Sequence, residues 1–382
     1  MSVYDTVVGQ AAAVAQLSRA ASPEGSLAQA WLVAGPPGSG RSSIARAFAA
    51  SLLCDGSVGG QGCGECQPCR TVLAGSHGDV TVVRTETLTI SKNEVRELVS
   101  TAQRAPASGR HRVLIIEDAD RMSPGTFNVL LKAIEEPPPR TVWLLCVPSP
   151  QDLAQTIRSR CRVVNLQVPP PDAVAMLLIE RDGVEPELAH RAAASAQGHI
   201  GIARRYGLHP DSLAEREDSA RKLLALTSVG HALAFAKTLI DRAEAEAHTE
   251  ADEASARERE QFMRGAGIEP GGRIPPALRA QVKALDDEAK RRATRLVRDV
   301  IDRYLLDIHS VLRDVLTLQL NTGATLVNPG IERELRDRTH VHSPQTTLAL
   351  LDCVGTARER VGMNVPPQLA LEALLAAIVA AR

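Results

Sequence analysis

Aromatic residues are scarce in this sequence and make up only 2% of its 382 residues. Hydrophobic residues as a whole still account for 44%, so the cores must be built mainly from aliphatic side chains. This composition favours a helix-rich protein, and the length is sufficient for two or three domains.

An excess of positive charge is also absent, because the formal net charge is −1. Tight binding to nucleic acid needs many basic groups near the phosphates, so the isolated chain is not expected to bind DNA strongly. No apolar run reaches the roughly 18 residues that span a membrane, and the first residues lack the pattern of a signal peptide. We therefore expect no membrane segment and a cytoplasmic location, where thiols stay reduced.

Residues 35–43, with the sequence GPPGSGRSS, form the most informative motif. They lie between an apolar run at 31–34 and a helical pattern at 44–53. A glycine-rich turn between a strand and a helix is the setting of a phosphate-binding loop, because its N–H groups and the helix N-terminus face the anion. The candidate nucleotide-binding positions in this loop are Gly35, Gly38, Gly40, Arg41, Ser42 and Ser43.

Arg41 is the residue at which this loop departs from the pattern, which has lysine at that position. Lysine places a compact charge on the β- and γ-phosphates, whereas the guanidinium of arginine is larger and forked. Ser42 keeps the hydroxyl that binds magnesium in such loops. The motif predicts the fold, leaves binding of ATP or ADP open, and argues against hydrolysis at a useful rate.

Strands and helices alternate as far as residue 167, which predicts an α/β domain with a mostly parallel sheet. Strands are expected at 31–34, 80–84, 112–118, 141–147 and 162–166, and helices at 124–136 and 150–158. Ligands of such sheets bind at the carboxyl ends of the strands. The loop after residue 34, the acids at 117 and 118, and the loop after residue 147 are therefore expected to lie together.

Glu117 and Asp118 end the most apolar of these strands, where an acid pair would hold a metal ion and activate water. The usual order is Asp followed by Glu, and here it is reversed. A shorter acid in the second position would hold the water too far from a phosphate. The alternative interpretation is that two solvated acids simply end a strand.

Cys54, Cys63, Cys66 and Cys69 follow the pattern C-x8-C-x2-C-x2-C. Four thiolates at this spacing are typical of a closed, tetrahedral, structural Zn²⁺ site, which leaves no position for a reactive water. The alternative is a set of free thiols on a loop. The remaining cysteines lie in apolar runs and are expected to be small buried hydrophobic residues, namely Cys146, Cys161 and Cys353.

The segment TIRSRC at 156–161 places two arginines at a corner between a helix and a strand. An arginine at such a corner usually forms a surface ion pair. Beside a phosphate-loop domain, however, it can also serve as an arginine finger that reaches the nucleotide of a neighbouring subunit.

Three prolines at 169–171 suggest a linker after the first domain, at 1–167. A small helical unit is expected at 168–207, and an all-helical domain at 208–382. Within the latter, residues 242–280 are dense in charge and then rich in glycine and proline. We expect an insertion there, a solvated helix followed by a flexible loop, whose removal leaves folding intact.

Together these residues resemble the bacterial clamp-loader subunits of the AAA+ class, most closely the delta-prime family of DNA polymerase III. The resemblance covers the first 206 residues and is carried by 8–10, 35–43, the cysteine module, 117–118, LLKAIEEPP at 130–138 and SRC at 159–161. It implies an AAA+ domain with an inserted zinc module, then a helical lid and a helical collar. It also implies that Arg160 is the finger and that the four cysteines bind zinc.

Several departures from the active members of this class fall on one site. Those members carry lysine at position 41, threonine in a sensor where Val147 and Pro148 stand, and arginine in the last lid helix where Gly201 appears. Arg204 and Arg205 follow nearby, however. Arg160 is intact, which favours a subunit that serves its neighbour's site rather than its own.

The resemblance therefore implies a non-hydrolysing subunit of a hetero-pentamer with gamma/tau-like and delta-like subunits. The sliding clamp and primed DNA would be reached through that complex, which belongs to the DNA polymerase III holoenzyme, a DNA-directed DNA polymerase. Whether the chain is itself an enzyme stays open. One alternative is an active gamma/tau-like ATPase in which Arg41 replaces lysine, which ATP turnover by the purified chain would reveal. The other is a DNA-binding zinc protein, which would show salt-sensitive binding.

Overall fold

The computed structural model describes residues 2–83, 89–265, 275, 279–363 and 365–381. The chain divides into two compact units, Met1–His209 and Pro210–Arg382. Every strand of the described residues lies in the first unit, and the second unit is helical. Among the described residues, no helix combines the length and the apolarity that a membrane span requires.

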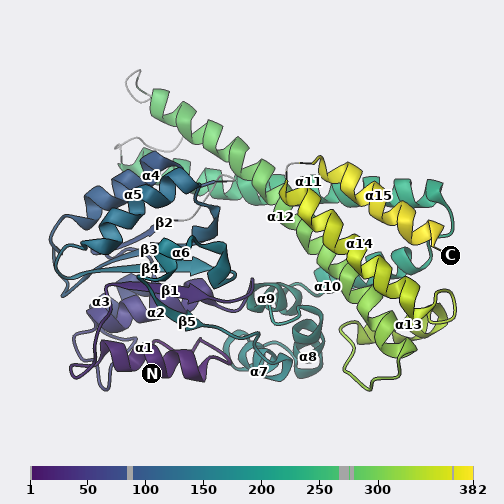
Figure 1. Ribbon diagram of the computed structural model, residues 1–382, viewed down its shortest axis with the longest axis horizontal. Helices are drawn as coiled ribbons and strands as arrows, with labels where there is room; N and C mark the ends of the chain where they lie inside the picture. Colours follow the sequence, from purple (N-terminus) through teal and green to yellow (C-terminus); the bar gives the residue numbers. More distant parts are fainter. Residues whose placement is uncertain (1, 84–88, 266–274, 276–278, 364, 382) are drawn as a thin grey trace. The chain divides into compact units, whose positions relative to one another are not determined.

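The first unit is built on a five-stranded sheet with the strand order β2-β3-β4-β1-β5 (Figure 1). All four pairings between neighbouring strands are parallel. The strands are β1 (Ala30–Ala34), β2 (Val80–Val83), β3 (Arg112–Ile116), β4 (Thr141–Val147) and β5 (Arg162–Asn165). The predicted parallel α/β sheet is thus confirmed. Because parallel strands need crossover connections, the chain crosses one face of the sheet between each strand and the next strand along the chain.

Alternate residues of the central strands feed two separate cores. Trp31 and Val33 of β1 pack on the side of α1 (Ala11–Ala21), α2 (Arg41–Leu53) and α3 (Gln67–Leu73). Leu32 and Ala34 pack on the side of α4 (Lys92–Ala102), α5 (Pro124–Glu135) and α6 (Gln155–Arg158). Figure 1 shows these two groups of helices on opposite faces of the sheet. Burial of both faces explains why β1, β3 and β4 are continuous apolar runs.

Local signals set several helix boundaries. A capping box starts α4 at Ser91, since its hydroxyl accepts from the Glu94 N–H while the Glu94 carboxylate accepts from the Ser91 N–H. Helix α5 begins at Pro124 and ends just before a run of three prolines that cannot continue it.

Several predicted elements differ in extent. The helix expected at 150–158 is a 3-10 turn, Pro150–Asp152, followed by the short helix α6. Leu153 and Ala154 between them have extended backbones, and Leu153 is buried. The strand expected at 80–84 ends at Val83, and residue 84 lies outside the described residues. The acids at 117 and 118 follow β3 rather than belonging to it.

Three helices complete the first unit after the proline run, and the described residues of the second unit form six α-helices. The first three are α7 (Pro171–Asp182), α8 (Pro186–Ser195) and α9 (Ile200–Leu208). The second unit contains α10 (Pro210–Leu224), α11 (Val229–Gly265), α12 (Arg279–Gln319), α13 (Glu332–Arg338), α14 (Pro344–Gly362) and α15 (Pro367–Ala380).

The helix α11 corrects our interpretation of residues 242–280. We expected a solvated helix without an apolar stripe from residue 242 onward. Instead, α11 runs unbroken through this point and buries Ala243, Ala247 and Ala251, which are spaced four residues apart on one face. The small alanines form an apolar stripe that the dense charges on the other faces concealed. Removing this segment would thus remove buried side chains. Residues 266–274 and 276–278 of the expected loop lie outside the described residues.

The carboxylate of Asp79 organises the loop that enters β3. It is fully buried and accepts hydrogen bonds from the N–H groups of Ala107, Ser108 and Gly109, at 2.6–2.9 Å. Its Oδ1 also lies 3.2 Å from Nη2 of Arg112. Burial alone would raise the pKa of Asp79, but the three N–H donors outweigh burial and lower this pKa to about 2.

We expect the Asp79→Asn substitution to lower the free energy of unfolding by about 2–4 kcal/mol at pH 7, because an amide cannot accept all these bonds and the buried Arg112 guanidinium loses the negative charge that balances it. The folded-state pKa is depressed, so the charged form of Asp79 stabilises the fold above about pH 4 and this contribution disappears as pH falls toward 2. Urea unfolding at several pH values measures it. The variant should lose less stability than wild type between pH 4 and pH 2. Asp172→Asn is the control, since that carboxyl is 93% exposed.

Candidate functional site

The loop at 35–43 leaves the end of β1 and turns directly into α2. The Gly35 N–H donates to the Val147 carbonyl at 3.1 Å, which extends the pairing of β1 with β4 by one residue. A Cβ on Gly35 would lie 2.7 Å from both Cβ of Leu166 and Oγ of Ser39. Gly40, the residue before α2, has a φ of 91° that favours glycine. The glycines of the motif are thus required by packing and by backbone conformation.

The side chain of Arg41 folds back onto its own loop. Its Nη1 donates to the Gly35 carbonyl at 2.8 Å. The positive charge therefore stays beside the loop, but one guanidinium N–H that could donate to an anion donates to a backbone carbonyl instead. Ser42 and Ser43 begin the same helix, with Ser42 half-buried and Ser43 exposed.

The two acids lie at the same edge of the sheet as the loop, because β3 and β1 both pair with β4. Oε1 of Glu117 is 3.4 Å from Nη2 of Arg46, on the first helix after the loop. Asp118 has a φ of 54°, in the left-handed region that non-glycine residues seldom adopt. The structure thus brings together the three segments that the sequence placed at this edge, with Glu117 already in an ion pair.

The N-terminus of α9 closes over the loop. The Ile200 N–H donates to the Gly38 carbonyl at 3.3 Å, and a Cβ on Gly38 would lie 2.5 Å from Cα of His199. Nδ1 of His199 in turn accepts from the Ile202 N–H at 3.2 Å and caps α9. The helical unit after the prolines is therefore held against the phosphate loop by backbone contacts.

A cavity of about 460 Å³ lies between this loop, residues 6–8 and the ends of α7 and α9. Three arginines line it, namely Arg41, Arg181 and Arg204. Arg204 Nε is 3.1 Å from Asp182, which also accepts from Arg181, and these hydrogen bonds lower the pKa of Asp182. Gly201 lines the cavity too. Sequence reasoning missed His199 and Arg181, although the segment GHIG at 198–201 marks the start of this helix.

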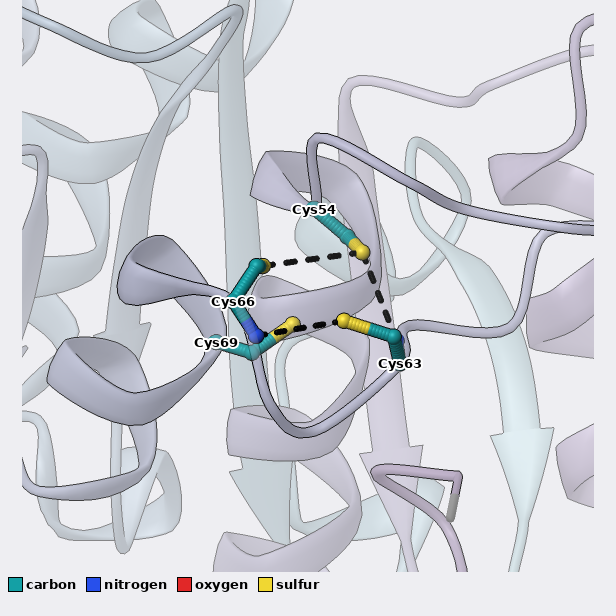
Figure 2. A group of neighbouring side chains, drawn as sticks. All are labelled: Cys54, Cys63, Cys66 and Cys69. Carbon is teal, nitrogen blue, oxygen red and sulfur yellow. Dashed lines mark hydrogen bonds between the residues drawn. The ribbon is translucent and has the colours of Figure 1, made fainter.

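The four cysteines predicted as metal ligands converge on one point (Figure 2). Their sulfur atoms all lie within 4.8 Å of one another, and those of Cys54 and Cys66 are 3.8 Å apart. A tetrahedron with metal–sulfur distances of about 2.3 Å has edges of about 3.8 Å, so the cluster has the right size for one metal ion. The Cys63 N–H donates to Sγ of Cys54, and the Cys66 N–H to Sγ of Cys63, each at 3.3 Å. These four side chains could therefore hold one metal ion.

Local structure sets the reactivity of these thiols. Hydrogen bonds from the N–H groups of Cys66 and Glu65 lower the pKa of Cys63 to about 6. Burial instead raises the pKa of Cys69. Metal binding requires thiolates, so the proton of Cys69 would be displaced by the ion. The cluster is attached to the phosphate loop through α2, which begins at Arg41 and is capped by Cys54.

The other three cysteines are separate from this cluster. Cys146 is fully buried, as expected, whereas Cys161 and Cys353 are only partly buried. Burial raises the pKa of both Cys146 and Cys161 to about 12, so neither is a reactive thiolate.

Arg160 lies at the surface of the first unit, between α6 and β5. Its Nη1 donates to the Thr156 carbonyl at 2.8 Å, and its Nη2 is 2.6 Å from Oε1 of Glu135. The side chain is 40% exposed. Arg160 is absent from the residues that line the cavity beside the phosphate loop, so this arginine and that loop form two distinct sites.

Comparisons with known proteins match part of this chain. A family model described as "DNA polymerase III, delta subunit" matches residues 9–170. The delta' subunit of Pseudomonas aeruginosa is 38% identical over 39% of this chain and 46% of its own length. The delta' subunit of Bacillus subtilis is 32% identical over 55% of this chain and 63% of its own length. The gamma/tau subunit of Mycobacterium bovis is 34% identical over 47% of this chain and 32% of its own length.

These matches leave part of every relative uncovered, since the chain spans from about a third to just under two thirds of their lengths. Both the delta' and the gamma/tau subunits match at similar identity. The choice between those two kinds of subunit therefore depends on the residues at the site.

We expect the Gly38→Ala substitution to lower the free energy of unfolding of the first unit by about 1–3 kcal/mol more than Gly40→Ala, because its Cβ would collide with His199. The comparison is matched, since both glycines have a positive φ but a Cβ on Gly40 would meet nothing within 4 Å. Urea unfolding measures the difference. Hydrogen exchange should also show loss of protection at the Ile200 N–H in the Gly38 variant alone. Equal effects of the two variants would contradict the contact.

Proposed function

We propose that this chain, whose residues 9–170 match a family model described as "DNA polymerase III, delta subunit" and which resembles two delta' subunits, acts as a delta-prime-like clamp-loader subunit that hydrolyses no ATP itself. In this proposal Arg160 completes the ATP site of an adjoining gamma/tau-like subunit. The complex would contain five subunits, including a delta-like one, and would open a sliding clamp and place it on primed DNA. The second, helical unit would be the collar that holds the ring together.

The observation that carries the proposal is the contrast between the two arginines. Arg41 is turned back onto the carbonyl of its own loop, and Glu117 at the same edge is paired with Arg46. Arg160 lies outside this cavity, on the surface, where it can meet another chain. Positive charge directed to a neighbour's phosphates stabilises the charge that develops in phosphoryl transfer. The lost lysine and the retained finger motif are together consistent with a subunit that assists hydrolysis without performing it.

We also propose that the cysteine cluster holds Zn²⁺ in a structural role. The four sulfur ligands fit a closed tetrahedral site, because soft thiolates favour zinc and no position remains for a reactive water. The ion would join the end of α2 to the start of α3, and the Gly62 carbonyl beside it accepts from the Val3 N–H at 3.0 Å. Zinc would therefore also hold the N-terminal segment at Val3, which leads to residues 6–8 at the cavity beside the phosphate loop.

The Arg160→Ala substitution tests the finger in a complex reconstituted with this chain. ATP hydrolysis at the adjoining site should fall by on the order of 10³–10⁵, because the charge supplied in trans is lost. The measurement is ATPase activity stimulated by clamp and primed DNA. Arg158→Ala is the control, since it removes a half-buried arginine from the same segment, two residues before Arg160.

An unchanged stimulated ATPase with Arg160→Ala would overturn the finger assignment. The purified chain alone should turn over no ATP above the rate without protein. Turnover that disappears on Arg41→Ala would instead support an active gamma/tau-like ATPase.

The zinc assignment predicts one equivalent of zinc per chain after purification without added chelator. Cys66→Ser should remove it and lower the melting temperature, because the remaining three thiolates no longer close the site. Elemental analysis and thermal unfolding are the measurements. Cys353→Ser, in the second unit, should retain full zinc. A chain without zinc that has the wild-type melting temperature would refute the structural role.

A further inference from the structure

Glu135 and Arg160 form an ion pair in which each end of the guanidinium has a partner. Oε1 of Glu135 lies 2.6 Å from Nη2 of Arg160, and Nη1 donates to the Thr156 carbonyl at 2.8 Å. Glu135 is the last residue of α5, and Arg160 follows the end of α6. The arginine is therefore held in one orientation by a carboxylate and a carbonyl, although its side chain is exposed.

Helix stability gives no reason for an acid at position 135. A carboxylate at the C-terminal end of a helix faces the negative end of the helix dipole, which is unfavourable. Glu136 follows it as the C-cap, so two negative charges stand at this end. The ion pair with Arg160 is the contact that accounts for Glu135.

The pair is suited to exchange rather than to permanent bonding. The side chains of Arg160 and Glu135 are 40% and 38% exposed, and ion pairs in such positions are weak and screened by salt. A phosphate offers the same kind of charged oxygen to the guanidinium fork with more negative charge. A phosphate brought near Arg160 would therefore displace the carboxylate of Glu135.

We propose that Glu135 is a positioning residue that occupies, in the free chain, the place in the Arg160 fork that the γ-phosphate of a neighbour's ATP takes in the complex. This inference rests on the proposed function. Glu135 orders the guanidinium beforehand and competes with the phosphate for it. The competition raises the ATP concentration that the adjoining site requires. It leaves the rate of the chemical step unchanged once the phosphate has displaced Glu135 from Arg160.

The experiment compares five forms of this chain in the reconstituted complex: wild type, Glu135→Gln, Glu135→Asp, Glu136→Gln and Arg160→Ala. Glu135→Gln should lower the KM for ATP by about two- to fivefold at low salt, because an exposed ion pair of this kind changes a binding equilibrium by about that factor. The kcat should be unchanged, and the difference in KM should shrink at high salt. Glu136→Gln is the matched control, because it removes the same charge from the next residue, which is also exposed. Glu135→Asp should restore the wild-type KM in part.

A second measurement examines the pair without the complex. Phenylglyoxal modification of Arg160, followed by mass spectrometry of the isolated chain, should be about two- to fivefold faster in Glu135→Gln and unchanged in Glu136→Gln.

The outcomes separate the two proposals. If Arg160→Ala leaves the stimulated ATPase unchanged, the proposed function fails. If Arg160→Ala abolishes the stimulation but Glu135→Gln has the KM of Glu136→Gln, or lowers kcat instead, the role of Glu135 is overturned while the proposed function stands. Equal modification of Arg160 in all glutamate variants would likewise refute the pairing.

Discussion

The pairing of β1 on both of its edges is the constraint on which the rest of the first unit depends. β1 lies between β4 and β5 and is buried on both faces, so its end has a single position in the molecule. The phosphate loop leaves that end, α2 runs from the loop to the first cysteine of the four-cysteine cluster, and Arg160 lies two residues before β5. One strand thus positions the loop, the cluster and the finger candidate at once.

The same arrangement separates the phosphate loop of this chain from Arg160, the residue that is proposed to serve a neighbour's site. The N-terminus of α9 contacts Gly38 at one side of the cavity beside the loop, and the arginines of the cavity are engaged with the loop carbonyl and with Asp182. Arg160 stands outside it and is held by a weak, exposed pair. The weak partner of a cation can be displaced by an anion that binds more strongly, whereas Arg41 is held by a carbonyl of its own backbone. This difference in surroundings, rather than a difference in residue type, gives the two arginines different roles in the proposal.

Much of the fold could be predicted because the signals are local. The apolar runs at 112–116 and 141–147 and the capping box at Ser91 need only near neighbours in the sequence, and all three are present. The prediction was wrong for α11, where alanines every fourth residue form the buried stripe. Alanine is compatible with both buried and exposed helix faces, so its burial depends on a second helix packing close by, which the sequence of α11 does not reveal.

For the candidate site, the sequence by itself determined the residue types and their spacing: the glycines and Arg41 of the loop, the four cysteines, and Arg160 in its motif. Each is a short run whose chemistry can be recognised without a fold. Only the tertiary structure decided what these residues contact. Examples are Glu117 with Arg46, Gly38 with His199, and Glu135 with Arg160, pairs that are between 25 and 161 residues apart in the sequence. Such contacts arise where helices pack over a sheet, and this packing depends on the whole chain rather than on any local pattern.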